Sequence, residues 1–130
     1  KYFLVTKKKS YQSQDSVSCS KCHEIDLCLI SPENQFRRIL NSIFQKKNIS
    51  PNVLIESNSL IHLFSHVSSS DLSTIMPGSF AKQFNFNSEI SFIELSDPSI
   101  FHDVGGVYIK DKGPSPIKDR FIKYLTSIDK

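Results

Sequence analysis

The chain has 130 residues, of which 38% are hydrophobic, so it is long enough for one domain with its own core. Its 16 Lys and Arg residues nearly balance 13 Asp and Glu residues, and a net charge of +3 gives no argument for a nucleic-acid-binding surface. No apolar run approaches the roughly 18 residues of a membrane span, and we find no signal peptide. The odd number of cysteines, 3, favours a reducing compartment over a disulfide framework.

The N-terminal part of the chain predicts two strands and one short helix. Residues 2–6 combine β-branched and aromatic side chains, which is typical of a strand. Because this strand follows the first residue at once, and that residue is not Met, we expect a piece of a longer protein. Residues 7–9 are lysines, which we interpret as a solvated turn, with a phosphate-binding patch as the alternative. Ser18 can cap a short helix over residues 19–24, and residues 27–30 predict a buried strand.

Residues 31–47 predict the clearest helix of the chain. Ser31 is a good N-cap residue, Pro32 suits the first helical position, and Glu33 complements the positive end of the helix dipole. Pro51 prevents the helix from continuing. The apolar residues of this segment recur with helical spacing, at Phe36, Ile39, Leu40, Ile43 and Phe44.

A strand, a helix and a second strand are predicted over residues 52–77. Residues 53–55 form a short apolar run of the kind found in strands buried on both faces. Ser57 or Asn58 can cap the following helix, and a second apolar run covers residues 72–76. The connection is long enough for a parallel crossover. The apolar face of the helix consists of Leu60, Leu63, Phe64 and Val67.

In the C-terminal part we expect one or two helical turns over residues 79–84 and strands at residues 90–95 and 104–109. A last helix covers residues 115–128, with a serine as its cap and Pro116 at its first position. Strands and helices thus alternate along the chain. This order predicts an α/β fold with a mostly parallel sheet flanked by helices.

The cysteines offer only weak candidate sites. Residues 19–23 have the C-x-x-C-H form of c-type haem attachment, but Met76 lies in a predicted buried strand and the α/β pattern is wrong for a small cytochrome. A redox pair of the first two cysteines is a second alternative, although its usual flanking residues are absent. Zinc is a third, with the ligand set Cys19, Cys22, Cys28 and His23.

The remaining motifs give no support for an enzyme. His62 and His66 have a metal-compatible spacing, but no acidic residue lies between them, and we interpret them as the polar edge of an amphipathic helix. The chain has no G-x-S-x-G motif and no glycine-rich phosphate loop. We therefore expect no catalytic residues, no cofactor and no metal.

Polar residues at two predicted strand ends form the best candidate binding site. Residues 31–35 follow one strand and residues 56–59 follow the next. Free backbone N–H groups at helix starts bind carboxylates and oxyanions, and serine and asparagine side chains supply neutral hydrogen bonds. Ordinary helix capping by the same residues is the alternative interpretation.

Several short segments share a pattern with one known family. Residues 51–59 have the form p.v..E.ds, residues 67–77 the form lV..g.G...lP, and residues 109–125 the form lsp.a..Fi..l. Shorter matches cover residues 1–5, 17–30 and 36–40. In this order and spacing, the segments resemble the second lobe and C-terminal segment of the effector-binding domain of LysR-type transcriptional regulators. The family usually has glycines where this chain has Ser70 and Leu72, so we expect the turn there to differ.

The resemblance implies a lobe of the periplasmic-binding-protein type 2 kind, in a bacterial regulator that also has a first lobe and an N-terminal winged helix-turn-helix. Residues 1–112 would form the second lobe, and residues 113–130 a C-terminal helix that returns towards the missing first lobe. The whole protein would be a cytoplasmic homo-oligomer, such as a dimer, without membrane contact. It would bind DNA only through the absent N-terminal domain and a small-molecule effector between the lobes.

The resemblance also implies which residues contact the effector. The cleft wall would consist of Ser31, Pro32, Glu33, Asn34 and Gln35, with Ser57 and Asn58 as a supporting edge. Because Glu33 would repel an anion unless it points to solvent, the charge of the effector stays open. The alternative function is a lobe of a solute-binding protein.

The last helix is expected to be the least secure part of the fold. Since it would pack towards the missing first lobe, its apolar face should be exposed, or covered by another copy of the chain. This face consists of Ile117, Phe121 and Leu125.

Overall fold

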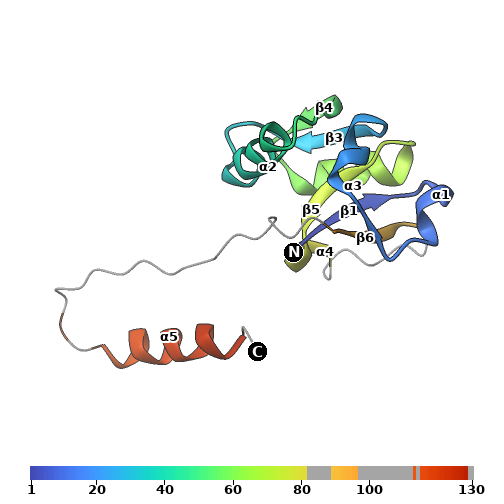
Figure 1. Ribbon diagram of the computed structural model, residues 1–130. Coiled ribbons are helices and arrows are strands. Elements are labelled where there is room, and N and C mark those ends of the chain that lie inside the picture. The colour runs from blue at the N-terminus through green and yellow to red at the C-terminus, as the bar shows by residue number, and fades with distance from the viewer. Residues whose placement is uncertain (82–88, 97–112, 114, 129–130) are drawn as a thin grey trace.

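The computed structural model describes residues 1–81, 89–96, 113 and 115–128. Residues 1–96 contain a β-sheet with helices packed on it, and the helix α5 (Pro116–Ile128) stands apart from this α/β part in Figure 1. The predicted strand at residues 104–109 lies outside the described residues. Within the described ranges, no helix is long and apolar enough to cross a membrane.

The strands join in the order β4-β3-β5-β1-β6-β2. Sheet pairing links β2, β6, β1 and β5, and a second pairing links β3 and β4. An isolated bridge from Leu27 of β3 to Ser73, the residue directly before β5, joins the two groups of strands. β1 runs antiparallel to both of its neighbours, and the other pairs are parallel. The prediction of a mostly parallel sheet is therefore confirmed, with β1 as the exception. The strands are β1 (Tyr2–Thr6), β2 (Ser16–Val17), β3 (Asp26–Ile30), β4 (Asn52–Ser57), β5 (Thr74–Pro77) and β6 (Ser91–Leu95).

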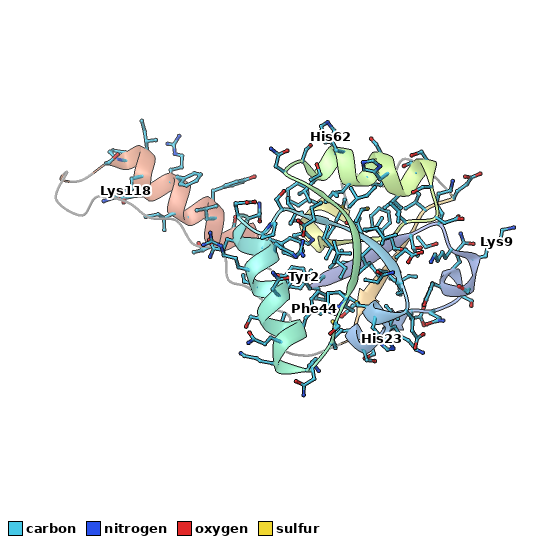
Figure 2. The ribbon with its side chains drawn as sticks, turned by 90° about the horizontal axis from the view of Figure 1, so that it is seen from above. Tyr2, Lys9, His23, Phe44, His62 and Lys118 are labelled. Atoms are coloured by element: carbon cyan, nitrogen blue, oxygen red, sulfur yellow. The ribbon has the colours of Figure 1, made fainter. Side chains whose placement is uncertain are left out.

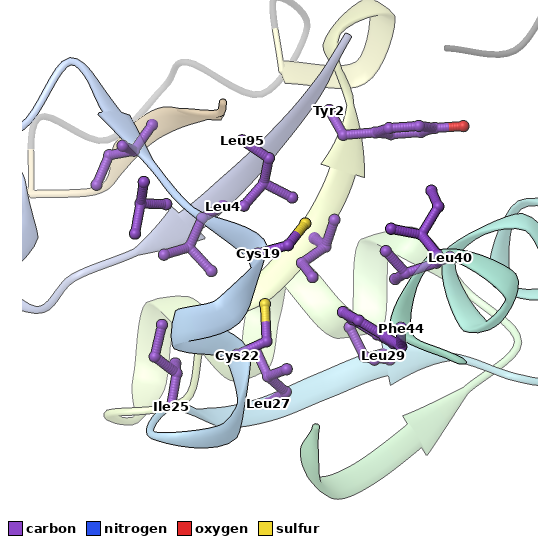
Figure 3. Packing of buried hydrophobic residues seen from close by; sticks show 14 residues of the cluster. Tyr2, Leu4, Cys19, Cys22, Ile25, Leu27, Leu29, Leu40, Phe44 and Leu95 are labelled. Carbon is purple, nitrogen blue, oxygen red and sulfur yellow. The ribbon is translucent and has the colours of Figure 1, made fainter. Parts of the chain in front are cut away.

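Two hydrophobic clusters cover the two faces of the sheet. Neighbouring residues of β3 belong to different clusters, Leu29 to one and Cys28 to the other, because successive side chains of a strand point to opposite faces. The first cluster includes buried residues of α2 (Gln35–Lys46) and of the 3₁₀-helix η1 (Cys19–His23), as Figure 3 shows. The second includes the buried side of α3 (Leu60–Ser69). The apolar side of α2 therefore packs on one face of the sheet, and the apolar side of α3 packs on the other.

Two short elements escaped sequence prediction, and one was placed approximately. The helix α1 (Lys9–Gln12) and the strand β2 are too short to show a period. The helix α4 (Gly78–Ala81) occupies the start of the segment predicted as helical at residues 79–84. Figure 2 shows the resulting arrangement, with Tyr2 and Phe44 inside the molecule and Lys9 and His62 at its outer surface.

The prediction that residues 53–55 are buried on both faces is wrong. The side chain of Leu54 is 58% exposed, and exposed and half-buried residues alternate along β4. In the described sheet β4 pairs only with β3, so it is an edge strand. A register shift opposite Leu27 and Cys28 pairs Val53 with Leu27 and Ile55 with Cys28, which leaves Leu54 as the extra residue of a bulge.

The predicted exposure of the last helix is confirmed. The exposed fractions of Ile117 and Phe121 are 83% and 57%, and Leu125 is exposed as well. The predicted cap is also present, since the Ser115 hydroxyl accepts a hydrogen bond from the Lys118 amide at 3.3 Å. The helix therefore forms from local signals, while its apolar face contributes little to the core.

A buried and an exposed phenylalanine allow a matched test of how much each region contributes to the free energy of unfolding. Phe44 is 2% exposed, so Phe44→Ala should lower the free energy of unfolding by about 3–5 kcal/mol, from lost burial and a residual cavity. Phe121→Ala on α5 should change it by less than about 0.5 kcal/mol. Urea unfolding of both variants measures the difference. Equal losses would show that α5 packs on the α/β part in solution.

Candidate functional site

The carboxyl ends of β3 and β4 lie side by side. The two strands are parallel, and Ile30 pairs with Ser57 at the end of the register. The pairing extends one residue further, because the Ser31 amide donates to the Ser57 carbonyl at 2.9 Å. The fold thus brings together the two polar segments that the sequence singled out, and ligands in open α/β sheets bind at such strand ends.

The predicted start of α2 is wrong by three residues. Asn34 is the N-cap, and its side-chain oxygen accepts a hydrogen bond from the Phe36 amide at 2.9 Å. The Asn34 amide in turn donates to the Ser31 carbonyl at 3.0 Å, so Ser31 and Pro32 belong to a turn before the helix. An asparagine caps a helix as well as a serine does, and here the turn decides which residue has the required geometry.

The predicted contact residues form a mostly solvent-facing surface. Pro32, Glu33, Asn34, Gln35 and Asn58 are exposed, whereas Ser31 and Ser57 are half-buried. The Ser57 hydroxyl accepts a hydrogen bond from the Ser59 amide at 3.2 Å, which fixes the turn into α3. Ser59 is the N-cap of that helix, so neither Ser57 nor Asn58 takes the predicted position.

Arg37 is the residue of this region that the sequence prediction missed. It is 6% exposed, and its Nη1 atom lies 2.9 Å from both the Ile30 carbonyl and the Glu56 carboxylate. Its Nε atom donates to the Asn41 side chain at 2.8 Å. A signal was present, since position 37 lies three residues before Leu40 and therefore on the apolar side of the predicted helix.

The cysteines lie in the core and not at a surface site. Cys19, Cys22 and Cys28 are buried, while the neighbouring His23 is exposed, with its Nδ1 atom against the Ser20 carbonyl. Figure 3 shows Cys19 and Cys22 among apolar side chains. Burial raises the pKa of the Cys28 thiol to about 11, so this thiol stays neutral at physiological pH.

No group of three or more potential metal ligands is present in the part of the chain that the structure describes. His62 on α3 is exposed and His66 is half-buried, as expected for the polar edge of an amphipathic helix. A surface hollow on α5 is lined by Pro116, Ile117, Arg120, Phe121 and Tyr124.

The turn at Ser70 and Leu72, where the family usually has glycines, is closed by the Ser70 side chain. The Ser70 hydroxyl donates to the His66 carbonyl at 2.6 Å and accepts from the Leu72 amide at 3.2 Å. The Ser68 carbonyl accepts a further bond from the Lys7 ammonium group at 2.9 Å. These contacts satisfy backbone groups at the end of α3, a task that glycine-based caps perform through the backbone.

Comparison with known proteins places the chain in a family. The model of the LysR substrate binding domain matches residues 1–128. The chain belongs to the LysR substrate-binding domain family. This confirms both the resemblance and the predicted fold class.

Several solved structures share the fold of this LysR substrate-binding domain. The regulatory domain of Synechocystis CcmR in complex with 2-PG has a TM-score of 0.75 at 10% identity, covering 98% of this chain and 62% of that one. The effector-binding domain of QuiR in complex with shikimate has a TM-score of 0.66 at 16% identity, with 95% and 58% covered. Full-length CbnR complexed with target DNA has a TM-score of 0.70 at 16% identity, with 97% and 44% covered.

The chain therefore spans between 44% and 62% of the length of these three proteins. No match was found among curated proteins.

Thiol reactivity tests the structural role of the cysteines. Because all three are buried, the folded chain should react with a disulfide reagent at pH 8 at least about a hundredfold more slowly than the urea-unfolded chain. The unfolded chain should release three equivalents of the reagent's leaving-group thiol, one for each cysteine. Rapid reaction of two thiols in the folded chain would contradict this arrangement and favour a redox pair at Cys19 and Cys22.

Proposed function

We propose that the chain is the second lobe of the effector-binding domain of a LysR-type transcriptional regulator and senses a small polar metabolite. The observation that supports this most directly is the hydrogen bond between the Ser31 amide and the Ser57 carbonyl. It holds the polar ends of two parallel strands against each other, at the edge of the sheet where ligands bind in such folds. The family match over residues 1–128 gives the context.

The chemistry of the wall favours a ligand that is held by hydrogen bonds. Ser31, Gln35, Ser57 and Asn58 offer neutral donors and acceptors, and the first turn of α2 supplies backbone N–H groups and the positive end of its dipole. Glu56 compensates the charge of Arg37 and Glu33 is exposed, so these side chains offer a ligand no positive charge, and only the N-terminus of α2 favours an acidic group. We propose a small organic acid or polar metabolite, in keeping with the 2-PG and shikimate bound by CcmR and QuiR.

Signal transmission would follow a population shift. An effector that binds one arrangement of the lobes better than the other moves the equilibrium towards that arrangement. In a full-length regulator this change would reach an N-terminal DNA-binding domain, in a protein organised like the DNA-bound CbnR. We propose that the regulator is a cytoplasmic homo-oligomer and that the domain is not an enzyme.

We further propose that residues 113–130 leave the second lobe, residues 1–112, to pack against the first. The apolar face of α5 is exposed at Ile117, Phe121, Tyr124 and Leu125, and a contiguous patch of this kind is unusual unless a partner surface covers it. The chain covers only 58% of the QuiR effector-binding domain, which leaves room for a first lobe of comparable size.

Two glutamines of α2 provide a matched test of the binding wall. Gln35 is the exposed first residue of the helix, in the polar segment that follows β3, and Gln45 lies exposed near the other end of the helix. In the full-length regulator, Gln35→Ala should weaken binding of an organic-acid effector by roughly three- to tenfold, the worth of one neutral hydrogen bond. Gln45→Ala should leave the affinity unchanged.

Isothermal titration with shikimate and 2-PG as first probes, followed by a panel of small organic acids, measures this difference. Equal affinities of the two variants for a ligand that binds the wild type would refute the wall assignment. If no polar metabolite raised the melting temperature of the wild-type regulator, the sensing role would be refuted.

A second pair of variants tests the position of α5. If the first lobe covers the apolar face, Phe121→Ser should lower the melting temperature of the full-length regulator by several degrees, at about 2–4 °C per kcal/mol lost. Lys123→Ser, an exposed and polar position of the same helix, should not. Thermal unfolding of the two variants measures the difference. Identical melting temperatures would show that no surface covers Phe121.

A further inference from the structure

The buried guanidinium group of Arg37 joins the ends of two strands through a single atom. Nη1 carries two hydrogens, and it lies 2.9 Å from the Ile30 carbonyl and 2.9 Å from Oε1 of Glu56. Ile30 is the last residue of β3, directly before Ser31, and Glu56 stands directly before Ser57 in β4. One nitrogen atom therefore contacts the residue directly before each half of the proposed wall.

The third partner of Arg37 fixes the direction of the side chain. Nε donates to Oδ1 of Asn41, one turn further along α2, at 2.8 Å. With the guanidinium plane held from its own helix, the two bonds of Nη1 position the strand ends relative to α2. The burial of Arg37 requires these partners, because a buried charge without them would be strongly destabilising.

The register of the strand pair shows why the carboxyl ends of β3 and β4 need a separate contact that holds them together. At the opposite end of the pair, Nδ2 of Asn52 donates to Oδ1 of Asp26 at 2.6 Å. Between the two ends, the register shifts at Leu27 and Cys28, so the bulge at Leu54 loosens the geometric link along β4. As an edge strand, β4 has no second neighbour in the described sheet to correct its position.

We infer that Arg37 is a positioning residue that clasps the carboxyl ends of β3 and β4 and thereby sets the spacing between Ser31 and Ser57 in the effector wall. This inference rests on the proposed function for its meaning, since the wall matters only if it binds a ligand. It concerns the unliganded domain, and it is tested without a ligand. Because Arg37 is 6% exposed and paired with Glu56, we assign it no direct contact with an effector.

Amide hydrogen exchange of the chain, followed residue by residue by NMR, tests the clasp. In Arg37→Met, the amides of Ser31 and Ser59, which donate to Ser57, should exchange about tenfold faster or more, because the strand end opens more often. The amides of β1, in the middle of the sheet, should change much less. Arg38→Met is the matched control, since Arg38 is the exposed neighbour on the same helix, and it should leave all of these amides unchanged.

Two further variants separate positioning from simple loss of stability. Arg37→Lys should restore only part of the protection, because an ammonium group cannot reach Asn41, Ile30 and Glu56 in one plane. Glu56→Gln, at a partly exposed position, should accelerate the same two amides by a smaller factor, and it serves as the test if Arg37→Met does not fold. Unchanged protection of Ser31 and Ser59 in the folded variants, or a uniform acceleration of all amides, would overturn the inference.

The failure of this inference and that of the proposed function have different signatures. If the clasp is absent, the exchange rates show it, whether or not any metabolite binds. If the two amides exchange faster in the variants as expected, but no polar metabolite binds the wild-type regulator, the positioning role of Arg37 is supported and the sensing role is refuted.

Discussion

The candidate site depends on the parallel pairing of β3 with β4. Parallel strands place their carboxyl ends at one edge of a sheet, and here the register ends with Ile30 opposite Ser57. Each strand then turns directly into a polar segment and a helix. The site is thus a consequence of topology: residues more than twenty positions apart become neighbours because both strands point in the same direction.

The same pairing creates the weakness that Arg37 compensates. β4 is an edge strand with a bulge at Leu54, so the pairing with β3 alone does not hold its carboxyl end firmly. A buried arginine is costly unless every partner is in place, and this arginine has one partner on each strand end and one on its own helix. Because the buried charge of Arg37 needs all three partners at once, it holds the two strand ends at a fixed distance from each other and from α2.

Sequence patterns predicted those features whose causes are local. The apolar stripe of α2, the cap and first turn of α5 and the burial of Cys28 and Met76 all follow from periodicity, end signals and residue type. The start of α2 was misplaced because Ser31 and Asn34 are equally good caps in isolation. The choice between them depends on the turn before the helix, which the end of β3 imposes.

The sequence by itself determined the fold class, the family and the two polar segments, because these depend on alternation, periodicity and the order of motifs. Only the tertiary structure decided that β4 is an exposed edge, that β1 runs against its neighbours and that Arg37 pairs with Glu56. The physical reason is that each of these features depends on which strand lies beside which. The partners of a strand, like the Glu56 partner of Arg37, lie on other segments of the chain and leave no mark in local composition.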